Sequence, residues 1–284
     1  MKLTPQQLSL SLEEIIKTSR IQIHCLPDSK AVFEHMARSI ADEIKINNLN
    51  GIPTRLILPV GPVDQYPLLM DICNREMISW KNVFTFNMDE YCDWQGRPLP
   101  AEHPLRFETY MRTQVFAQLN PDLRIPDHQV FFPDPLHLDA ISQQITTLGG
   151  IDTCYGGIGY HGHIAFNEPP NSLYFRVTIE EFKASQTRIV QLNPDTIVMN
   201  STWNTGGNPY LLPPMAVTLG MSDILASRRI RLYCNGGSWQ RTALRVALLS
   251  PEDSDYPVTL LQNHPDYTII ADEDSAQPII PSLF

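Results

Sequence analysis

Several features that mark secreted, membrane-bound or nucleic-acid-binding proteins are missing from this sequence. The five cysteines are odd in number, scattered and without a Cys-x-x-Cys pair, which favours reduced thiols over a disulfide framework or a zinc site. No apolar run approaches membrane-spanning length, and the N-terminus lacks the apolar core of a signal peptide. Lysine and arginine form no run, and the net charge is −10. We therefore expect a cytoplasmic protein with no membrane and no nucleic-acid partner. A small anionic ligand stays compatible with this charge, because a few local arginines can outweigh the global field.

The 284 residues alternate apolar, strand-like runs with helical patterns, without an internal repeat or an evident linker. This alternation predicts an α/β fold with a doubly wound, mostly parallel, Rossmann-like sheet and helices on both faces. We expect a single domain over 1–284, with an N-terminal helical extension at about 1–20 that Thr4 caps and Pro5 opens. The predicted strands are 21–26, 55–60, 83–88, 152–158, 188–192, 230–234 and 267–271. The predicted helices are 30–46, 66–79, 104–119, 138–147 and 239–249. Segments 168–187 and 200–214 are long and weakly patterned, which is typical of lid loops.

The segment between Tyr155 and Pro169 contains the closest grouping of side chains able to take part in acid–base catalysis. An apolar run ends in glycines and is followed within eight residues by His161, His163, Asn167 and Glu168. Glycines allow a sharp turn and a close approach to a ligand, and α/β enzymes place acid–base groups at the carboxyl ends of strands. An ordinary glycine-rich turn with solvated histidines is the alternative for the His-Gly-His part alone. The two histidines have a spacing that a metal would accept, but the asparagine and glutamate suit acid–base work equally well, and we expect no metal site.

The block from Gly156 to Pro169, Gly-Gly-Ile-Gly-Tyr-His-Gly-His-Ile-Ala-Phe-Asn-Glu-Pro, resembles the signature of the glucosamine-6-phosphate deaminase/isomerase family. Further matches are Phe86-Asn-Met-Asp-Glu-Tyr91, Glu102-His-Pro104, Ser185-Gln-Thr-Arg-Ile189, Met215-Ala-Val-Thr-Leu-Gly220, Gln240-Arg-Thr-Ala-Leu244 and His264-Pro265. The likeness runs from about residue 55 to residue 272. It implies an enzyme of amino sugar metabolism, a hydrolase/isomerase that deaminates an amino sugar or its phosphate without an organic cofactor. Its partner would be that sugar or sugar phosphate, and a homo-oligomer is compatible with the family.

Such a reaction opens a pyranose ring, moves a proton between C2 and C1 and expels ammonia from C2. The resemblance implies that Asp89 is the carboxylate that moves the proton, that His163 opens the ring, and that Glu168 orients His163 and holds its tautomer. The alternatives are that Asp89 and Glu90 cap a turn after a strand, and that Glu168 is a solvated loop residue before a proline.

Two departures from the family pattern affect these roles. The family places an aspartate two residues before the catalytic histidine, where this chain has His161. A carboxylate would raise the pKa of the neighbouring imidazole, whereas a charged second imidazole would lower it. We expect His161 still to relay protons as a catalytic residue.

The second departure is at the expected phosphate site. The loop at 60–64 reads Val-Gly-Pro-Val-Asp, so that hydroxyl donors are absent and a negative charge is present, and Thr202 stands where the family often has an arginine. The remaining candidates for substrate binding are Gly61, Glu90, Arg188 and Arg241. Arg241 is able to bind a phosphate bidentately, and a solvated cation on a helix face is the alternative.

This chain keeps the acid–base residues of the family pattern, whereas the residues expected to bind the phosphate are changed. The combination predicts a changed substrate rather than an inactive protein. Two other hypotheses remain. One is a 6-phosphogluconolactonase-like hydrolase, since those enzymes share the fold and a Gly-His motif. The other is a sugar-phosphate-binding regulator without turnover, although no DNA-binding helix pair or basic region is evident.

Overall fold

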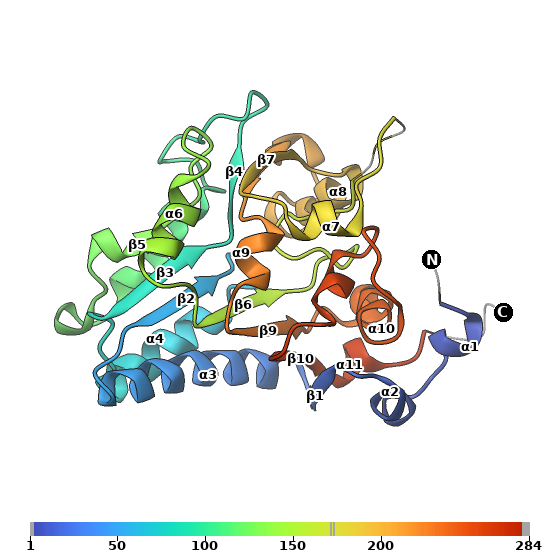
Figure 1. The fold of residues 1–284 in the computed structure, drawn as a ribbon. Helices are drawn as coiled ribbons and strands as arrows, with labels where there is room; N and C mark the ends of the chain where they lie inside the picture. Colours follow the sequence, from blue (N-terminus) through green and yellow to red (C-terminus); the bar gives the residue numbers. More distant parts are fainter. Residues whose placement is uncertain (1–2, 171, 173, 280–284) are drawn as a thin grey trace.

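A seven-stranded parallel sheet with helices on both faces forms the centre of the molecule (Figure 1). The computed structural model describes residues 3–170, 172 and 174–279. The strand order is β1-β10-β9-β6-β2-β3-β5, and all neighbouring pairs are parallel. These strands are β1 (Gln22–Leu26), β2 (Thr54–Leu58), β3 (Val83–Asn87), β5 (Val130–Phe131), β6 (Thr153–Gly157), β9 (Arg229–Cys234) and β10 (Tyr267–Asp272). The predicted α/β, doubly wound fold is confirmed.

The alternation of side chains along each strand supplies two separate cores. On β2, Leu56 and Leu58 pack against helices α3 (Ser29–Leu49) and α4 (Gln65–Arg75), while Ile57 faces the opposite side. There it joins the core under α6 (Ala140–Thr147), α9 (Met221–Leu225) and α10 (Arg241–Leu249). Burial of each such side chain stabilises the fold by about 1.5–3 kcal/mol. Because both faces are covered, the strands read as continuous apolar runs in the sequence.

The chain reverses its direction of travel across the sheet between β2 and β6. From β2 it continues to β3 and β5 on one side, and from β6 it continues to β9 and β10 on the other. At such a reversal the loops that leave two neighbouring strands diverge and open a crevice beyond their carboxyl ends. The loop after β2 carries the 60–64 segment, and the loop after β6 carries His161 and His163. The topology therefore brings the two departures from the family pattern to one place.

A second, antiparallel sheet of three strands lies beside the main sheet (Figure 1). Its order is β4 (Asp89–Cys92), β8 (Met215–Thr218) and β7 (Arg188–Gln191). The strand predicted at 188–192 exists but belongs to this sheet, and β4, β5 and β8 were not predicted. Asp89 begins β4 instead of ending the third strand. The polar sequence Asp-Glu-Tyr-Cys is fully buried and shows no alternation, so that pattern alone could not reveal a strand.

The helices differ from the sequence predictions mainly where short motifs break them. The N-terminal extension is two helices, α1 (Pro5–Leu8) and α2 (Leu12–Thr18), because Thr4 and Ser11 each form a capping box. The helix predicted at 104–119 is α5 (Phe107–Tyr110) followed by a π-turn and a 3₁₀-turn. The first predicted lid loop contains α7 (Ile179–Lys183), the second contains the last part of α8 (Pro194–Asn204), and residues 171 and 173 of the first lie outside the described residues.

The extension at the N-terminus packs against α10 and the last part of the chain. Leu3 and Leu8 form an apolar cluster with Val246, and the Ile279 N–H donates to the Leu8 carbonyl at 3.1 Å. Arg245 of α10 is fully buried and donates to the carbonyls of Leu10 and of Ala276 in α11 (Glu273–Ala276), both at 3.1 Å. One cation therefore joins both ends of the described chain. Within the described ranges, no helix has the length and apolar character needed to cross a membrane.

Candidate active site

The loops after β2 and β6 touch at the strand-order reversal. Gly157, the last residue of β6, lies so close to the β2 loop that an added Cβ would be 3.1 Å from Pro62 Cδ and 3.4 Å from the Gly61 carbonyl oxygen. A side chain at 157 would therefore push the two loops apart. The predicted Gly61 segment and the Gly-His segment are in this way brought together by the fold.

The His163 imidazole lies directly on the backbone of Gly159. A Cβ at Gly159 would overlap the ring, and the Gly159 N–H donates to the His163 carbonyl at 2.9 Å. The glycine is therefore required by close approach. Burial, together with the charge of His161, lowers the pKa of His163 to about 3. The ring is neutral at physiological pH, and its Nδ1 is buried without a hydrogen-bond partner.

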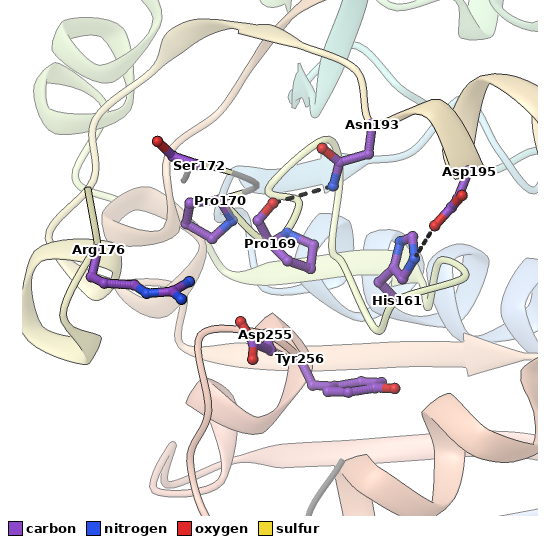
Figure 2. A pocket seen from close by; sticks show the side chains of 9 residues that line it. All are labelled: His161, Pro169, Pro170, Ser172, Arg176, Asn193, Asp195, Asp255 and Tyr256. Carbon is purple, nitrogen blue, oxygen red and sulfur yellow. Dashed lines mark hydrogen bonds and ion pairs between the residues drawn. The ribbon is translucent and has the colours of Figure 1, made fainter. Parts of the chain in front are cut away.

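His161 is paired with a carboxylate that the sequence did not reveal. Its Nε2 lies 3.1 Å from Oδ2 of Asp195, in the first turn of α8 (Figure 2). The Nδ1 atom of His161 is buried and has no partner. The two residues are 34 positions apart in the sequence, and no local motif joins them, which explains why sequence inspection missed the pair.

Glu168 is held by the start of α8. Its Oε2 accepts the Asn193 N–H at 2.7 Å, and Asn193 Nδ2 donates to the Pro169 carbonyl at 3.2 Å (Figure 2). Burial raises the pKa of Glu168 to about 7, although the Asn193 hydrogen bond opposes this shift. Oε1 of Glu168 is buried without a partner, as is Nδ1 of His163. No hydrogen bond links Glu168 to His163 in the described part of the chain, so the structure does not contain the predicted orienting contact.

Asp89 begins β4 and is only 7% exposed. The Met88 N–H before it donates to the Leu58 carbonyl at 3.0 Å, which fixes Asp89 next to the loop that leaves β2. Burial, and secondarily the charge of Glu90, raises the pKa of Asp89 to about 8. The buried phenol of Tyr91 senses the charges of both Asp89 and Glu168, which raise its pKa further after burial. Asp89 and Glu168 therefore lie close to one side chain.

Glu90 has a structural use that the prediction of substrate binding did not foresee. Its Oε1 accepts the N–H groups of Tyr91 and Phe107, both at 2.9 Å, and its Oε2 accepts the N–H of Glu108 at 2.8 Å. The carboxylate thus caps the start of α5 from a distant strand. Burial raises its pKa to about 7 in spite of these three donors.

The two arginines predicted to bind substrate have partners within the protein. Arg188 donates to Oδ1 of Asn167 at 2.9 Å and to Oγ of Ser185 at 3.2 Å, and burial lowers its pKa. It borders a cavity of ≈ 440 Å³ that Glu168 also lines. Arg241 forms an ion pair with the Asp274 carboxylate and donates through Nε to the Asp274 carbonyl at 3.0 Å. Its charge is therefore already compensated.

The loop expected to hold a phosphate is built without a cation. Asp64 lies at the N-terminus of α4 and makes no capping hydrogen bond, and Gln65 Nε2 donates to the Pro62 carbonyl at 2.8 Å. The Thr202 hydroxyl donates a hydrogen bond to the Met199 carbonyl at 2.6 Å. A helix N-terminus normally attracts an anion, but the Asp64 carboxylate places a negative charge at the N-terminus of α4, which disfavours a phosphate there.

A cavity of ≈ 640 Å³ opens beside the His161–Asp195 pair (Figure 2). Arg176, Asp255 and Tyr256 line it from the side opposite Asn193. The described residues include no group of three or more histidine, cysteine or acidic side chains able to hold a metal ion. The chemistry that this arrangement can perform is proton transfer among two carboxyl groups of raised pKa and two imidazoles.

Comparison with known proteins gives the family. No protein-family model matches the chain. The chain is 32% identical over 255 residues to glucosamine-6-phosphate deaminase of Phocaeicola vulgatus, covering 87% of this chain and 89% of that protein. It is 34% identical over 254 residues to glucosamine-6-phosphate deaminase of Caenorhabditis elegans, covering 86% of each chain.

Solved structures agree with the sequence relatives. One described as a monomeric glucosamine-6-phosphate deaminase superposes with a TM-score of 0.76 and 27% identity, covering 90% of this chain and 99% of that one. A 6-phosphogluconolactonase from Shewanella baltica has a TM-score of 0.62 and 18% identity over 90% and 99% of the two chains, a likeness that shows the fold alone. With a third of the residues identical to curated deaminases over most of both chains, this chain belongs to the glucosamine-6-phosphate deaminase family.

Proposed function

We propose that this protein deaminates and isomerises an amino sugar phosphate of the glucosamine-6-phosphate class and releases ammonia. The observation that supports this most directly is that Asp89, which follows β3, and His163 and Glu168, which follow β6, each have a strongly shifted pKa because of burial. Groups whose pKa values are pushed apart by their surroundings are typical of acid–base sites. The curated relatives are glucosamine-6-phosphate deaminases, and this arrangement fits their activity.

Ring opening is the first step, and we assign it to His163 with His161. The C1 hydroxyl loses its proton, its electron pair forms the C1 carbonyl, the C1–O5 bond breaks, and O5 takes a proton. An imidazole with a pKa of about 3 does not store a proton at neutral pH, so His163 must accept at one ring nitrogen as it gives at the other. Glu168 lies on the same loop as His163, and its orienting role there stays a prediction from the resemblance.

Proton transfer from C2 to C1 follows, with Asp89 as the base. The carboxylate removes the C2 proton, the C2–H electron pair forms the C1–C2 double bond, and O1 takes the proton that the C2 ammonium group gives up. The same carboxyl group then returns its proton to C1, which leaves an iminium group at C2. A pKa near 8 makes Asp89 a stronger base than a solvated carboxylate, which suits a weakly acidic carbon. The C2 ammonium of the substrate favours the ionised carboxylate, so binding lowers this pKa toward neutrality. Water then adds to the C2 iminium group, and ammonia leaves to give a ketose.

The substrate's phosphate end would meet a site with weak affinity for anions. The β2 loop offers no cation, and both candidate arginines have internal partners. We therefore expect the chemistry of the family to be kept while affinity for the phosphate is low. A cytoplasmic location and a homo-oligomer remain predictions from the sequence.

The experiment is a double assay of ammonia release and ketose formation from glucosamine 6-phosphate, galactosamine 6-phosphate and unphosphorylated glucosamine. Equal amounts of ammonia and ketose support the proposal. Hydrolysis of 6-phosphogluconolactone without ammonia release from any amino sugar would support the lactonase alternative instead. Saturable binding of a sugar phosphate with no turnover in either assay would indicate a regulator.

A further inference from the structure

Asp195 occupies an unusual place for a residue on the surface of a helix. Its side chain is 64% exposed, yet one carboxylate oxygen lies 3.1 Å from Nε2 of His161, whose side chain is only 21% exposed. Figure 2 shows the two groups facing each other across the start of α8. The helix therefore delivers a carboxylate to the loop after β6 from outside that loop.

The direction of this hydrogen bond settles which nitrogen of His161 carries a proton. An ionised carboxylate only accepts hydrogen bonds, so Nε2 must hold the proton and Nδ1 must present its lone pair when the ring is neutral. Nδ1 is buried and has no partner within the protein. His161 also lies near enough to His163 for its charge to be sensed there. The Gly159 N–H donates to the His163 carbonyl and the Gly162 N–H to the Gly159 carbonyl, both at 2.9 Å, so this buried acceptor nitrogen belongs to the same tight turn as the His163 imidazole.

On the basis of the proposed function, we propose that Asp195 is a positioning residue for ring opening. It holds His161 in the Nε2–H tautomer, so that the His161–Asp195 pair takes the place of the single carboxylate that the family carries at position 161. In this step Nδ1 of His161 receives the proton from the C1 hydroxyl and passes it to one ring nitrogen of His163. His163 gives the proton on its other ring nitrogen to O5 as the C1–O5 bond breaks. Both imidazoles end the step neutral, and the sugar has gained and lost one proton.

A purely structural role for Asp195 makes a different prediction. An acidic residue in the first turn of a helix stabilises that helix through its dipole, and its loss would lower stability without a kinetic signature. The other titratable groups around His161 are Tyr160 and His163 on its own loop and Arg176, Asp255 and Tyr256 across the cavity. None of these makes a hydrogen bond with the His161 ring, and Asp255 therefore provides a matched control for the tautomer of that ring.

The kinetic test compares Asp195→Asn with Glu13→Gln, which removes an exposed carboxylate from the first turn of α2, and repeats Asp195→Asn in a His161→Asp background. Asparagine keeps the shape but offers both a donor and an acceptor, so it no longer selects one tautomer. We expect Asp195→Asn to lower kcat on the closed pyranose by about 10- to 100-fold with little change in KM, and Glu13→Gln to leave it unchanged. In the His161→Asp background, which restores a carboxylate at 161, Asp195→Asn should cost less than about threefold. An equal loss in both backgrounds would overturn the proposal.

A second measurement decides the question without turnover. Imidazole ¹⁵N chemical shifts distinguish the two neutral tautomers, and the His161 signal is identified by its loss in His161→Asp. We expect the Nε2–H tautomer in the unaltered protein and a mixture in Asp195→Asn, with no change in Asp255→Asn. The Nδ1–H tautomer in the unaltered protein would refute the positioning role. If no amino sugar is deaminated, the proposed function fails, and this measurement still reports on the pair alone.

Discussion

Replacement of Asp89 by Asn tests the base that the structure provides for cleaving the C2–H bond. Asparagine keeps the size of the buried side chain and removes its basicity. With a pKa of about 8, about one tenth of the unaltered enzyme carries the ionised carboxylate at pH 7. The value of kcat/KM, which reports on the free enzyme, should therefore rise about tenfold between pH 7 and pH 9. His163 stays neutral over this range and contributes no opposing loss.

The Asp89→Asn variant should lose this pH dependence together with about 10²-fold or more of its turnover, while ligand binding persists. The assay is ammonia release in parallel with ketose formation on whichever amino sugar is turned over best. Asp71→Asn, which removes an exposed carboxylate of α4 that is paired with Arg75, is the matched control and should be neutral. Near-normal activity of Asp89→Asn, or a profile that is flat from pH 6 to pH 9, would remove Asp89 from the mechanism.

The same pKa shift predicts an effect on stability with a definite sign. The folded protein holds the Asp89 proton up to about pH 8, whereas the unfolded chain releases it near pH 4. The carboxyl group therefore opposes folding increasingly as pH rises through this window, and its full cost is present above pH 8. Asp89→Asn should be more stable than the unaltered protein at pH 9 by at least ~1 kcal/mol, with a smaller difference at pH 4. Urea unfolding at the two pH values measures this, and a stability gain that is larger at pH 4 would contradict the pKa assignment.

Four further predictions concern ring opening, the phosphate end and the termini. His163→Gln should be impaired on the closed pyranose but partly active on an open-chain analogue, and equal loss on both in steady-state assays would mean that the histidine has another task. Glucosamine 6-phosphate should be turned over weakly, with binding about two to four orders of magnitude below that of relatives whose loop supplies two more charge-assisted hydrogen bonds, and a micromolar KM would refute this. Arg241→Ala should change that KM by less than about threefold because Asp274 already holds the cation, and a large rise in KM would show that the substrate displaces Asp274. Arg245→Ala should lower stability by about 2–5 kcal/mol in thermal or urea unfolding, since two buried carbonyls lose their donor, and a change near zero would show that the termini are held by other contacts.

The local sequence was sufficient for most of the main sheet, and it gave the candidates for the acid–base groups. Alternating apolar runs predicted six of the parallel strands, because a strand covered on both faces must be apolar throughout. The Gly-His block predicted the position of the site, since Gly159 and His163 act within one tight turn whose geometry depends on neighbouring residues. The second sheet escaped prediction because its strands are short and, in the case of β4, polar where they are buried.

The partners of the charged groups were decided only by the tertiary structure. Arg241 was predicted to face a phosphate but lies against Asp274, and Glu90 was predicted to face substrate but caps α5 through Phe107 and Glu108. The carboxylate that contacts His161 comes from Asp195, on a helix that the sequence pattern did not predict. Periodicity reports which side of its own element a residue faces, because that depends on backbone repeats over a few residues. Which oppositely charged residue a side chain contacts depends on how elements that are distant in the sequence pack together. Residue spacing along the chain does not determine that packing.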